Sequence, residues 1–259
     1  MKWPTVLIAL ALPILWFLES AGAVDDPWRA VLSDPEPQAV GLEAVVDAET
    51  LRLGDGRLVR VSGLYGPAEA AVSAIASSAG GRSVRLYNPA TTRDRQGRLS
   101  AQIVVVGPAG QPSLWLQGEL LRAGQAFFYP AHPMADAPAQ AMLALESEAR
   151  REARGLWADA ANRVQDARTP ATIHPGFRLV EGVVQGVGES RHSLFVNFGP
   201  DYRKDFTIVV QRSDREGFAG GLRTIRALQG RHIRVRGLVF QQGGPAIRAM
   251  HQQVIEILD

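Results

Sequence analysis

The stretch of sequence that decides the fold runs from residue 45 to residue 69 and reads VVDAETLRLGDGRLVRVSGLYGPAE. In it, apolar residues alternate with polar ones on both sides of Gly54-Asp55-Gly56. An Asp-Gly turn between two such runs is a strong short-range signal for a β-hairpin, because glycine readily adopts the positive φ that the turn requires. The stretch therefore predicts two antiparallel strands, one before and one after residues 54–56.

The sequence around this hairpin predicts more strands and then helices. Strand-like patterns extend over residues 41–106, and two amphipathic segments follow them. Apart from the hairpin, the predicted elements are a short Ala-rich helix over 68–78, strands at 84–86 and 101–106, and helices over 114–123 and 139–156.

Four fragments, taken in chain order, resemble the staphylococcal nuclease (thermonuclease) family. The stretch 45–69 is similar to that family's Asp-Gly-Asp-Thr, an Arg-bearing strand and Gly-Ile-Asp-Ala-Pro-Glu. The fragment 94–99, DRQGRL, resembles its Asp-Arg-Tyr-Gly-Arg-Leu, while 114–126 and 146–157 resemble the ends of its later helices. The resemblance covers residues 40–158 and implies a mainly β, α+β fold: a five-stranded OB barrel with helices packed on it.

The resemblance also implies a site. In that family two aspartates and a backbone carbonyl hold calcium, a glutamate positions water, and two arginines bind phosphate. Asp47 and Glu49 match the first two acidic positions, although a glutamate carries its carboxylate about 1.5 Å farther out than an aspartate. Arg60 and Arg98 match the two phosphate-binding positions. Calcium is the cofactor expected if the site is active, and no cofactor is expected otherwise.

The second acidic cluster of the family is missing. Tyr65 stands where the family has a calcium-ligating Asp, and a phenol with a pKa of about 10 is a poor calcium ligand at neutral pH. Ala68 stands where the family has its water-positioning Glu, and losing a general base typically costs about 10²–10⁴-fold in rate. Glu69 replaces it only if the backbone shifts by one residue, which Pro67 opposes because its ring fixes φ.

Each matched residue also has an ordinary structural interpretation. Asp47 is of the type that caps a turn by bonding to nearby backbone. Arg60 and Arg98 are, on this interpretation, an edge-strand and a loop arginine, each paired with a carboxylate. The aligned context favours the family positions for both arginines.

A second unit follows a predicted linker over residues 159–175 and covers 176–259. Its net charge is +4 (12 basic minus 8 acidic residues over 169–259), which suits phosphate or anionic lipid. The alternative explanation of this positive charge needs no ligand: the whole chain has a general preference for arginine, since only two of its 28 basic residues are lysine. The expected elements are strands over 177–187, 193–198 and 206–211, a helix over 214–228, and strands over 233–240 and 246–258, an order that predicts a small OB-like barrel.

Aromatic and cationic residues interleave in the second unit, as they do in single-strand-binding barrels. The alternative is that part of this set is core, because the strand alternates with period two. The set comprises Phe195, Phe198, Tyr202, Arg203, Lys204 and Phe206.

The N-terminus predicts export. Lys2 precedes an apolar run of 13 residues, Val6 to Leu18, and Ala21-Gly22-Ala23 is typical of a signal-peptidase site. Residues 1–23 are thus a predicted signal peptide; an uncleaved anchor is the alternative, although a spanning helix needs about 20 residues. No stable membrane span is expected after cleavage, and the mature protein is expected in the periplasm or beyond.

The remaining composition narrows the chemistry. The chain has no cysteine, which excludes thiol catalysis and disulfides, and its five histidines are too dispersed for a zinc site of the usual spacing. The favoured hypothesis is an exported, catalytically degraded thermonuclease-like protein that binds single-stranded nucleic acid or an envelope protein. The alternative is a calcium-dependent phosphodiesterase that hydrolyses DNA or RNA.

Overall fold

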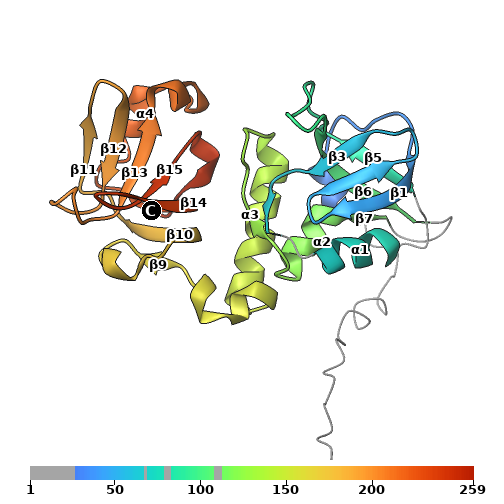
Figure 1. Cartoon of the computed structure of the whole chain (residues 1–259), viewed down its shortest axis with the longest axis horizontal. Helices are drawn as coiled ribbons and strands as arrows, with labels where there is room; N and C mark the ends of the chain where they lie inside the picture. The colour runs from blue at the N-terminus through green and yellow to red at the C-terminus, as the bar shows by residue number, and fades with distance from the viewer. Residues whose placement is uncertain (1–26, 67–68, 79–82, 108–112) are drawn as a thin grey trace, which may run out of the picture.

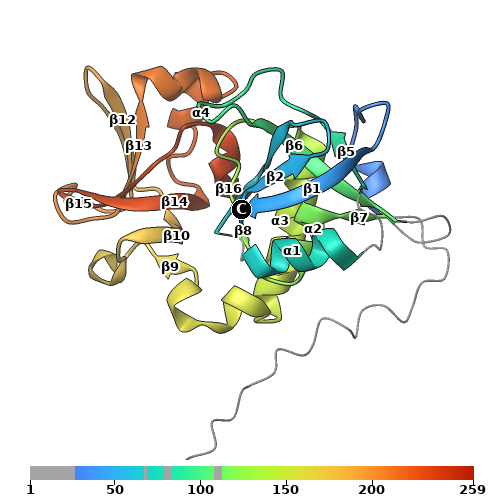
Figure 2. The ribbon, with the colours of Figure 1, turned by 45° about the vertical axis from the view of Figure 1, so that its right-hand side comes forward.

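Two β units lie on opposite sides of helix α3 (Asp136–Arg151), as Figure 1 shows, and Figure 2 presents the same two units in a view turned by 45°. The structure is a computed structural model that describes residues 27–66, 69–78, 83–107 and 113–259. The predicted signal peptide lies outside these residues. None of the helices in the described ranges combines the length and the apolar character needed to cross a membrane.

The first unit is a closed barrel of five strands. Neighbouring strands pair antiparallel in the order β3-β2-β1-β5-β6, and β3 then pairs in parallel with β6, which closes the barrel. This is the five-stranded Greek-key barrel of an OB fold, so the fold class predicted for this part of the chain is confirmed. The strands are β1 (Val40–Asp47), β2 (Thr50–Leu53), β3 (Leu58–Val61), β5 (Ser83–Tyr87) and β6 (Leu99–Val106).

The predicted hairpin is β2 and β3. Gly56 has a φ of 83°, and its amide donates a hydrogen bond to the carbonyl of Leu53 at 2.9 Å. Positive φ at this turn is the reason for a glycine here. The inward side chains of the hairpin, which form part of the barrel core, are all buried: Leu51, Leu53, Val59 and Val61.

Three helices pack on this barrel: α1 (Glu69–Ser78), α2 (Leu116–Arg122) and α3. The helix expected from residue 114 begins two residues later, because β7 (Leu114–Trp115) first pairs with β6. The last helix ends at Arg151, earlier than expected. Ala153 and Gly155 have φ values of 51° and 53°, which lie outside the right-handed helical region.

The second unit also has the strand order of an OB barrel. Strands β10 and β11 are the two halves of one bent segment, interrupted only at Val184 and Gln185. Because β10 pairs with β14 and β11 pairs with β12, this segment joins both ends of the path β11-β12-β13-β15-β14-β10. The strands are β10 (Gly176–Val183), β11 (Gly186–Glu189), β12 (Ser193–Asn197), β13 (Thr207–Gln211), β14 (His232–Gln242) and β15 (Gly244–Arg248).

Two expected elements of this unit are each divided in the structure. The helix expected over 214–228 is a 3₁₀ turn, Arg212–Gly217, followed by α4 (Leu222–Arg226). The division falls at Gly220 and Gly221, whose φ values of 82° and 56° interrupt a helix. The strand expected over 246–258 is β15 followed by a turn and then β16 (Ile255–Ile257), which pairs with β14.

The segment between the two units carries structure of its own. Strand β9 (Gln165–Asp166) pairs in parallel with β10. Ala167 and Ile173, which follow β9, are buried in the core of the second unit. Residues expected as a linker therefore pack against the barrel that follows them.

A buried ion-pair network joins the two units. Arg236 of β14 is 0% exposed and donates to Glu146 of α3 at 2.7 Å and to the carbonyl of Phe128 at 2.8 Å. It also pairs with Glu256 of its own unit. Burial lowers the pKa of Arg236, but the two glutamates outweigh that effect, so the pKa is raised overall. The guanidinium therefore remains charged where the units meet.

A histidine at the same junction predicts a pH dependence. His251 is buried, and its Nε2 lies 2.6 Å from the Pro130 carbonyl of the first unit, whereas its buried Nδ1 has no partner among the described residues. Burial, aided by His132, lowers the pKa of His251 despite that hydrogen bond. The unfolded chain thus binds a proton more readily than the folded protein below pH about 6.5.

We therefore expect the free energy of unfolding to fall as the pH drops below about 6.5 towards the lowered pKa of His251. Urea unfolding at pH 7.5 and at pH 5 measures this loss, which the His251→Gln variant should show to a smaller extent. An equal loss in the variant and the parent protein would assign the effect to other groups.

Candidate functional site

The two acidic candidates at the turn between β1 and β2 face different partners. Asp47 ends β1, and its Oδ1 accepts a hydrogen bond from the Glu49 amide at 2.8 Å, which is an Asx turn. The carboxylate of Glu49 extends instead to Arg60, with 3.2 Å between Oε2 and Nη2. One carboxylate thus holds the turn and the other holds an arginine.

Thr50 connects the two candidate arginines. It is the cross-strand partner of Arg60, and its buried Oγ1 accepts a hydrogen bond from Nη1 of Arg98 at 2.9 Å. The Nε of Arg98 donates to Asp94 at 2.7 Å, and Asp94 also accepts from the Arg98 amide at 2.9 Å. The structure thereby brings Arg60 and Arg98 to one end of the barrel.

Both arginines are held but remain partly accessible. The side chains of Arg60 and Arg98 are 22% and 15% exposed. Each is paired with a single carboxylate, Glu49 or Asp94, in the described part of the chain. A guanidinium has five N–H donors, so an incoming phosphate can share or displace these carboxylates. The cluster has the chemistry of an anion site whose resting state is internally neutralised.

Tyr65 lies at the junction with the second unit. It belongs to β4 (Leu64–Tyr65), which pairs with β8 (Phe127–Phe128). Its ring stacks on Phe177 of β10, with centroids 4.5 Å apart and planes 15° apart, and meets Tyr129 edge-on at 6.3 Å. Sequence reasoning missed Phe177, because a phenylalanine that begins a strand carries no signal of a partner in another unit.

Tyr129 links this aromatic contact to the arginine cluster. Its ring is edge-on to Phe177, with centroids 5.4 Å apart. Burial raises the pKa of the Tyr129 phenol, while Arg248 of the second unit and Arg60 of the first oppose the rise. Tyr129 therefore stays neutral near pH 7, with an arginine of each unit in its surroundings.

The described residues do not provide the donors that calcium requires. Glu69 is the first residue of α1 and is exposed, while Pro67 and Ala68 lie outside the described residues. Wherever the chain is described, no three His, Asp or Glu side chains gather closely enough to hold a metal ion. Calcium prefers six to eight oxygen ligands with carboxylates among them, so these residues do not fit the family's metal.

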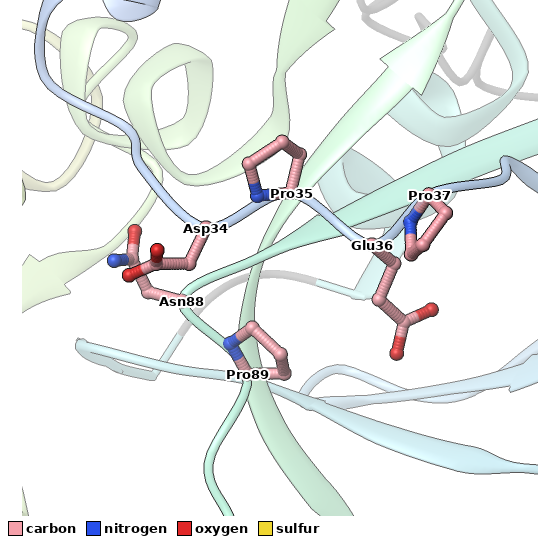
Figure 3. Close-up of a pocket in the computed structure, with 6 residues that line it drawn as sticks. All are labelled: Asp34, Pro35, Glu36, Pro37, Asn88 and Pro89. Carbon is pink, nitrogen blue, oxygen red and sulfur yellow. The ribbon is translucent and has the colours of Figure 1, made fainter.

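A hollow elsewhere on the first unit has a structural explanation. It measures about 500 Å³ and lies between the chain before β1 and the loop after β5. Figure 3 shows that the Glu36 carboxylate points away from Asp34 and Asn88, so no acidic cluster forms there. Glu36 binds Arg57 at 2.5 and 2.9 Å, and Asn88 donates to Ser33 at 2.8 Å. These contacts attach the leading segment to the barrel.

The closed barrel defines a class of protein: an OB-fold domain, here with two arginines brought together at one end. Comparison with known families identifies the particular domain, because residues 68–159 match the family model described as Staphylococcal nuclease homologue. The first unit is thus a staphylococcal-nuclease-like domain, a family related to nucleases and nucleic acids. The matched range contains Arg98, whereas Asp47, Glu49 and Arg60 precede it. No curated protein gives a significant match.

Proposed function

We propose that the protein binds single-stranded nucleic acid through Arg60 and Arg98 without hydrolysing it. One observation carries the proposal: the two arginines are joined through Thr50, whereas Tyr65, which stands at a calcium-ligand position of the family, packs on Phe177 of the second unit. Phosphate binding needs only cationic donors. Phosphodiester hydrolysis also needs a polarising cation and an activated water.

The ion pairs that Arg60 and Arg98 make with carboxylates determine how strongly nucleic acid is expected to bind. A phosphate at Arg60 competes with Glu49, and a phosphate at Arg98 competes with Asp94. Part of the electrostatic gain is therefore offset by the ion pairs that are given up. Binding of this kind is weak for each nucleotide and weakens steeply with salt, because each neutralised phosphate releases condensed counterions.

The Arg60→Ala and Arg98→Ala variants are expected to bind fluorescent single-stranded DNA more weakly, by roughly tenfold in the double variant. The plot of log Kobs against log salt should flatten by about 0.7 for each arginine that contacts a phosphate. Fluorescence anisotropy measures both quantities, and gel assays with calcium and then EGTA detect hydrolysis.

Arg52→Ala is the matched control. Arg52 lies on the same hairpin and also faces a glutamate, Glu43, at 4.0 Å, but its side chain is 48% exposed. If Arg60→Ala, Arg98→Ala and Arg52→Ala lost DNA affinity equally, the loss would reflect the change in net charge and not a specific site. Calcium-dependent cleavage that disappears in Arg98→Ala would establish the alternative, a working phosphodiesterase. Absence of DNA binding would leave a structural role or an interaction with a protein, such as one of the cell envelope.

We propose further that the protein is exported, with residues 1–23 as a cleaved signal peptide. The support is the sequence of a charged start, a short apolar run and Ala21-Gly22-Ala23. Intact-mass analysis of the protein from its native host decides between a chain that begins near Val24 and one that retains the leader.

A further inference from the structure

The second barrel carries a groove on the outer surface of β11, β12, β13 and β15, a site that the arginine cluster does not involve. The groove measures about 470 Å³. Figure 1 shows that β11 and β12 lie on the side of this barrel away from the first unit, so the groove is separate from the domain junction. Its principal lining residues are Gly188, Phe195, Asn197, Tyr202, Thr207 and Gln242.

Tyr202 projects from a loop that is held in place. It is the most exposed of the large hydrophobic residues in the described part of the chain, at 62%. The loop is closed by Asp201, whose carboxylate accepts from the Arg203 amide at 3.1 Å and whose own amide donates to Asp205 at 2.7 Å. The turn between β14 and β15 packs against it so closely that a Cβ on Gly243 would lie 3.1 Å from Cα of Arg203. An exposed ring on a fixed loop is a preorganised surface for stacking.

A second aromatic ring and a glycine also line the groove. Phe195 of β12 is half-buried, and its cross-strand partner is Gly188 of β11. A Cβ on Gly188 would meet nothing nearer than Nδ2 of Asn197, at 3.8 Å. Glycine inside a strand often marks a place where a ligand approaches the backbone closely. The missing side chain leaves space beside the Phe195 ring.

Polar groups lie beside the two rings. Oδ1 of Asn197 accepts a hydrogen bond from Thr207 at 3.2 Å, which fixes the amide with its Nδ2 towards Gly188. Gln242 is exposed at the end of β14. Amides of this kind both donate and accept, as the edges of nucleobases do.

The charge around the groove favours an anionic ligand. Glu189, the acid in the lining, is paired with two arginines, Arg215 at 3.0 Å and Arg226 at 2.9 Å. Arg203 lies over the Tyr202 ring, 5.5 Å from its centroid, and Lys204 beside it is 82% exposed and pairs with Asp201 at 3.8 Å, a carboxylate with which a phosphate at Lys204 competes. An uncharged sugar polymer would gain little from these cations, whereas a polyphosphate strand would gain from each of them.

We propose that this groove is a second binding site for single-stranded nucleic acid, with one base stacked on Tyr202 and another against Phe195. Arg203 and Lys204 meet the phosphates between them, and Asn197 and Gln242 contact base edges. Stacking on an aromatic ring is tolerant of sequence because every base has a π-face. The site shares its ligand class with the proposed function but does not depend on Arg60 or Arg98.

Binding of a fluorescent oligothymidylate to the full chain tests the proposal. Tyr202→Ala should weaken binding by about tenfold or more, whereas Tyr202→Phe should retain it, because the ring and not the hydroxyl carries the stacking. Val183→Ala, which shortens an exposed apolar side chain on β10, is the matched control and should have no effect. Quenching of tyrosine fluorescence on binding should disappear in Tyr202→Ala relative to the control.

The Arg60→Ala/Arg98→Ala double variant separates the two sites. Residual binding in that background which is lost on adding Tyr202→Ala supports the groove even if the arginine site fails. Unchanged affinity in Tyr202→Ala, with or without the arginine changes, would overturn the groove and leave the arginine proposal untouched. Tyr202-dependent binding of a neutral oligosaccharide in place of DNA would also overturn it, since the ligand would then lack phosphate.

Discussion

Arg236→Met is expected to lower the free energy of unfolding by about 3–5 kcal/mol, the largest effect on stability that we expect from one residue of this protein. The variant keeps most of the volume of the side chain but leaves Glu146 without its cationic partner, and Glu146 is itself 0% exposed. The carbonyl of Phe128 also loses its donor from Arg236. An uncompensated buried charge is far more costly than the same charge in water.

Urea unfolding monitored by tryptophan fluorescence measures this loss. Arg168→Met is the matched control, because Arg168 also pairs with an aspartate, Asp166, but its side chain is 82% exposed. Pairs at such exposure contribute about 0–1 kcal/mol. Adding Glu146→Gln to Arg236→Met removes the unpaired charge and should restore part of the stability. If Arg236→Met behaved like the exposed control, the buried network between the units would not exist in solution.

The first barrel could be predicted because its signals are local. Residues 54–56 define a hairpin without reference to any distant residue, and the fragment 94–99 combines a turn with the Asp94–Arg98 pair. The second barrel could be predicted from the order of the strands and helix expected along its sequence. The errors at helix ends arise where positive φ at Ala153, Gly220 or Gly221 interrupts a segment whose pattern continues.

The junction between the units could not be predicted, because it depends on contacts between distant residues. Arg236 occupies an outward position of β14, where alternation alone predicts an exposed side chain, yet α3 covers it. Tyr65 and Phe177 are 112 positions apart, and nothing at either position indicates the other. The proximity of Arg60 and Arg98 could not be predicted from local sequence either. Thr50 of β2 connects them, and it does so only once the barrel is closed.

These contacts together relate the second barrel to the candidate site on the first. Phe177 packs against Tyr65, the residue that the sequence resemblance places at a calcium-ligand position, and Tyr129 extends that contact towards Arg60. A ring in a stack stabilises the junction, whereas a carboxylate in the same place needs a cation or a hydrogen-bond donor. Tyr65 is therefore suited to an apolar junction between domains.

Replacing Tyr65 by aspartate is therefore expected to destabilise the protein by about 2–4 kcal/mol without creating a calcium site. The variant loses the stack on Phe177, and its carboxylate faces the apolar rings of Phe177 and Tyr129. Asp47 and Glu49 remain engaged with the turn and with Arg60. Tyr65→Phe is the control and should change stability by less than about 1 kcal/mol, because the stack is kept.

Calcium provides the decisive comparison for Tyr65→Asp. A ligand that binds only the folded protein stabilises it in proportion to the logarithm of its concentration over Kd. Urea unfolding of Tyr65→Asp with excess calcium and with EGTA should therefore give the same midpoint, and single-stranded DNA should stay intact in both. Suppose instead that calcium raised the midpoint and DNA were cut. Tyrosine in place of aspartate at position 65 would then be the one difference that keeps this barrel from acting as a hydrolase. The stack on Phe177 would then be a consequence of that substitution and not a barrier to reversing it.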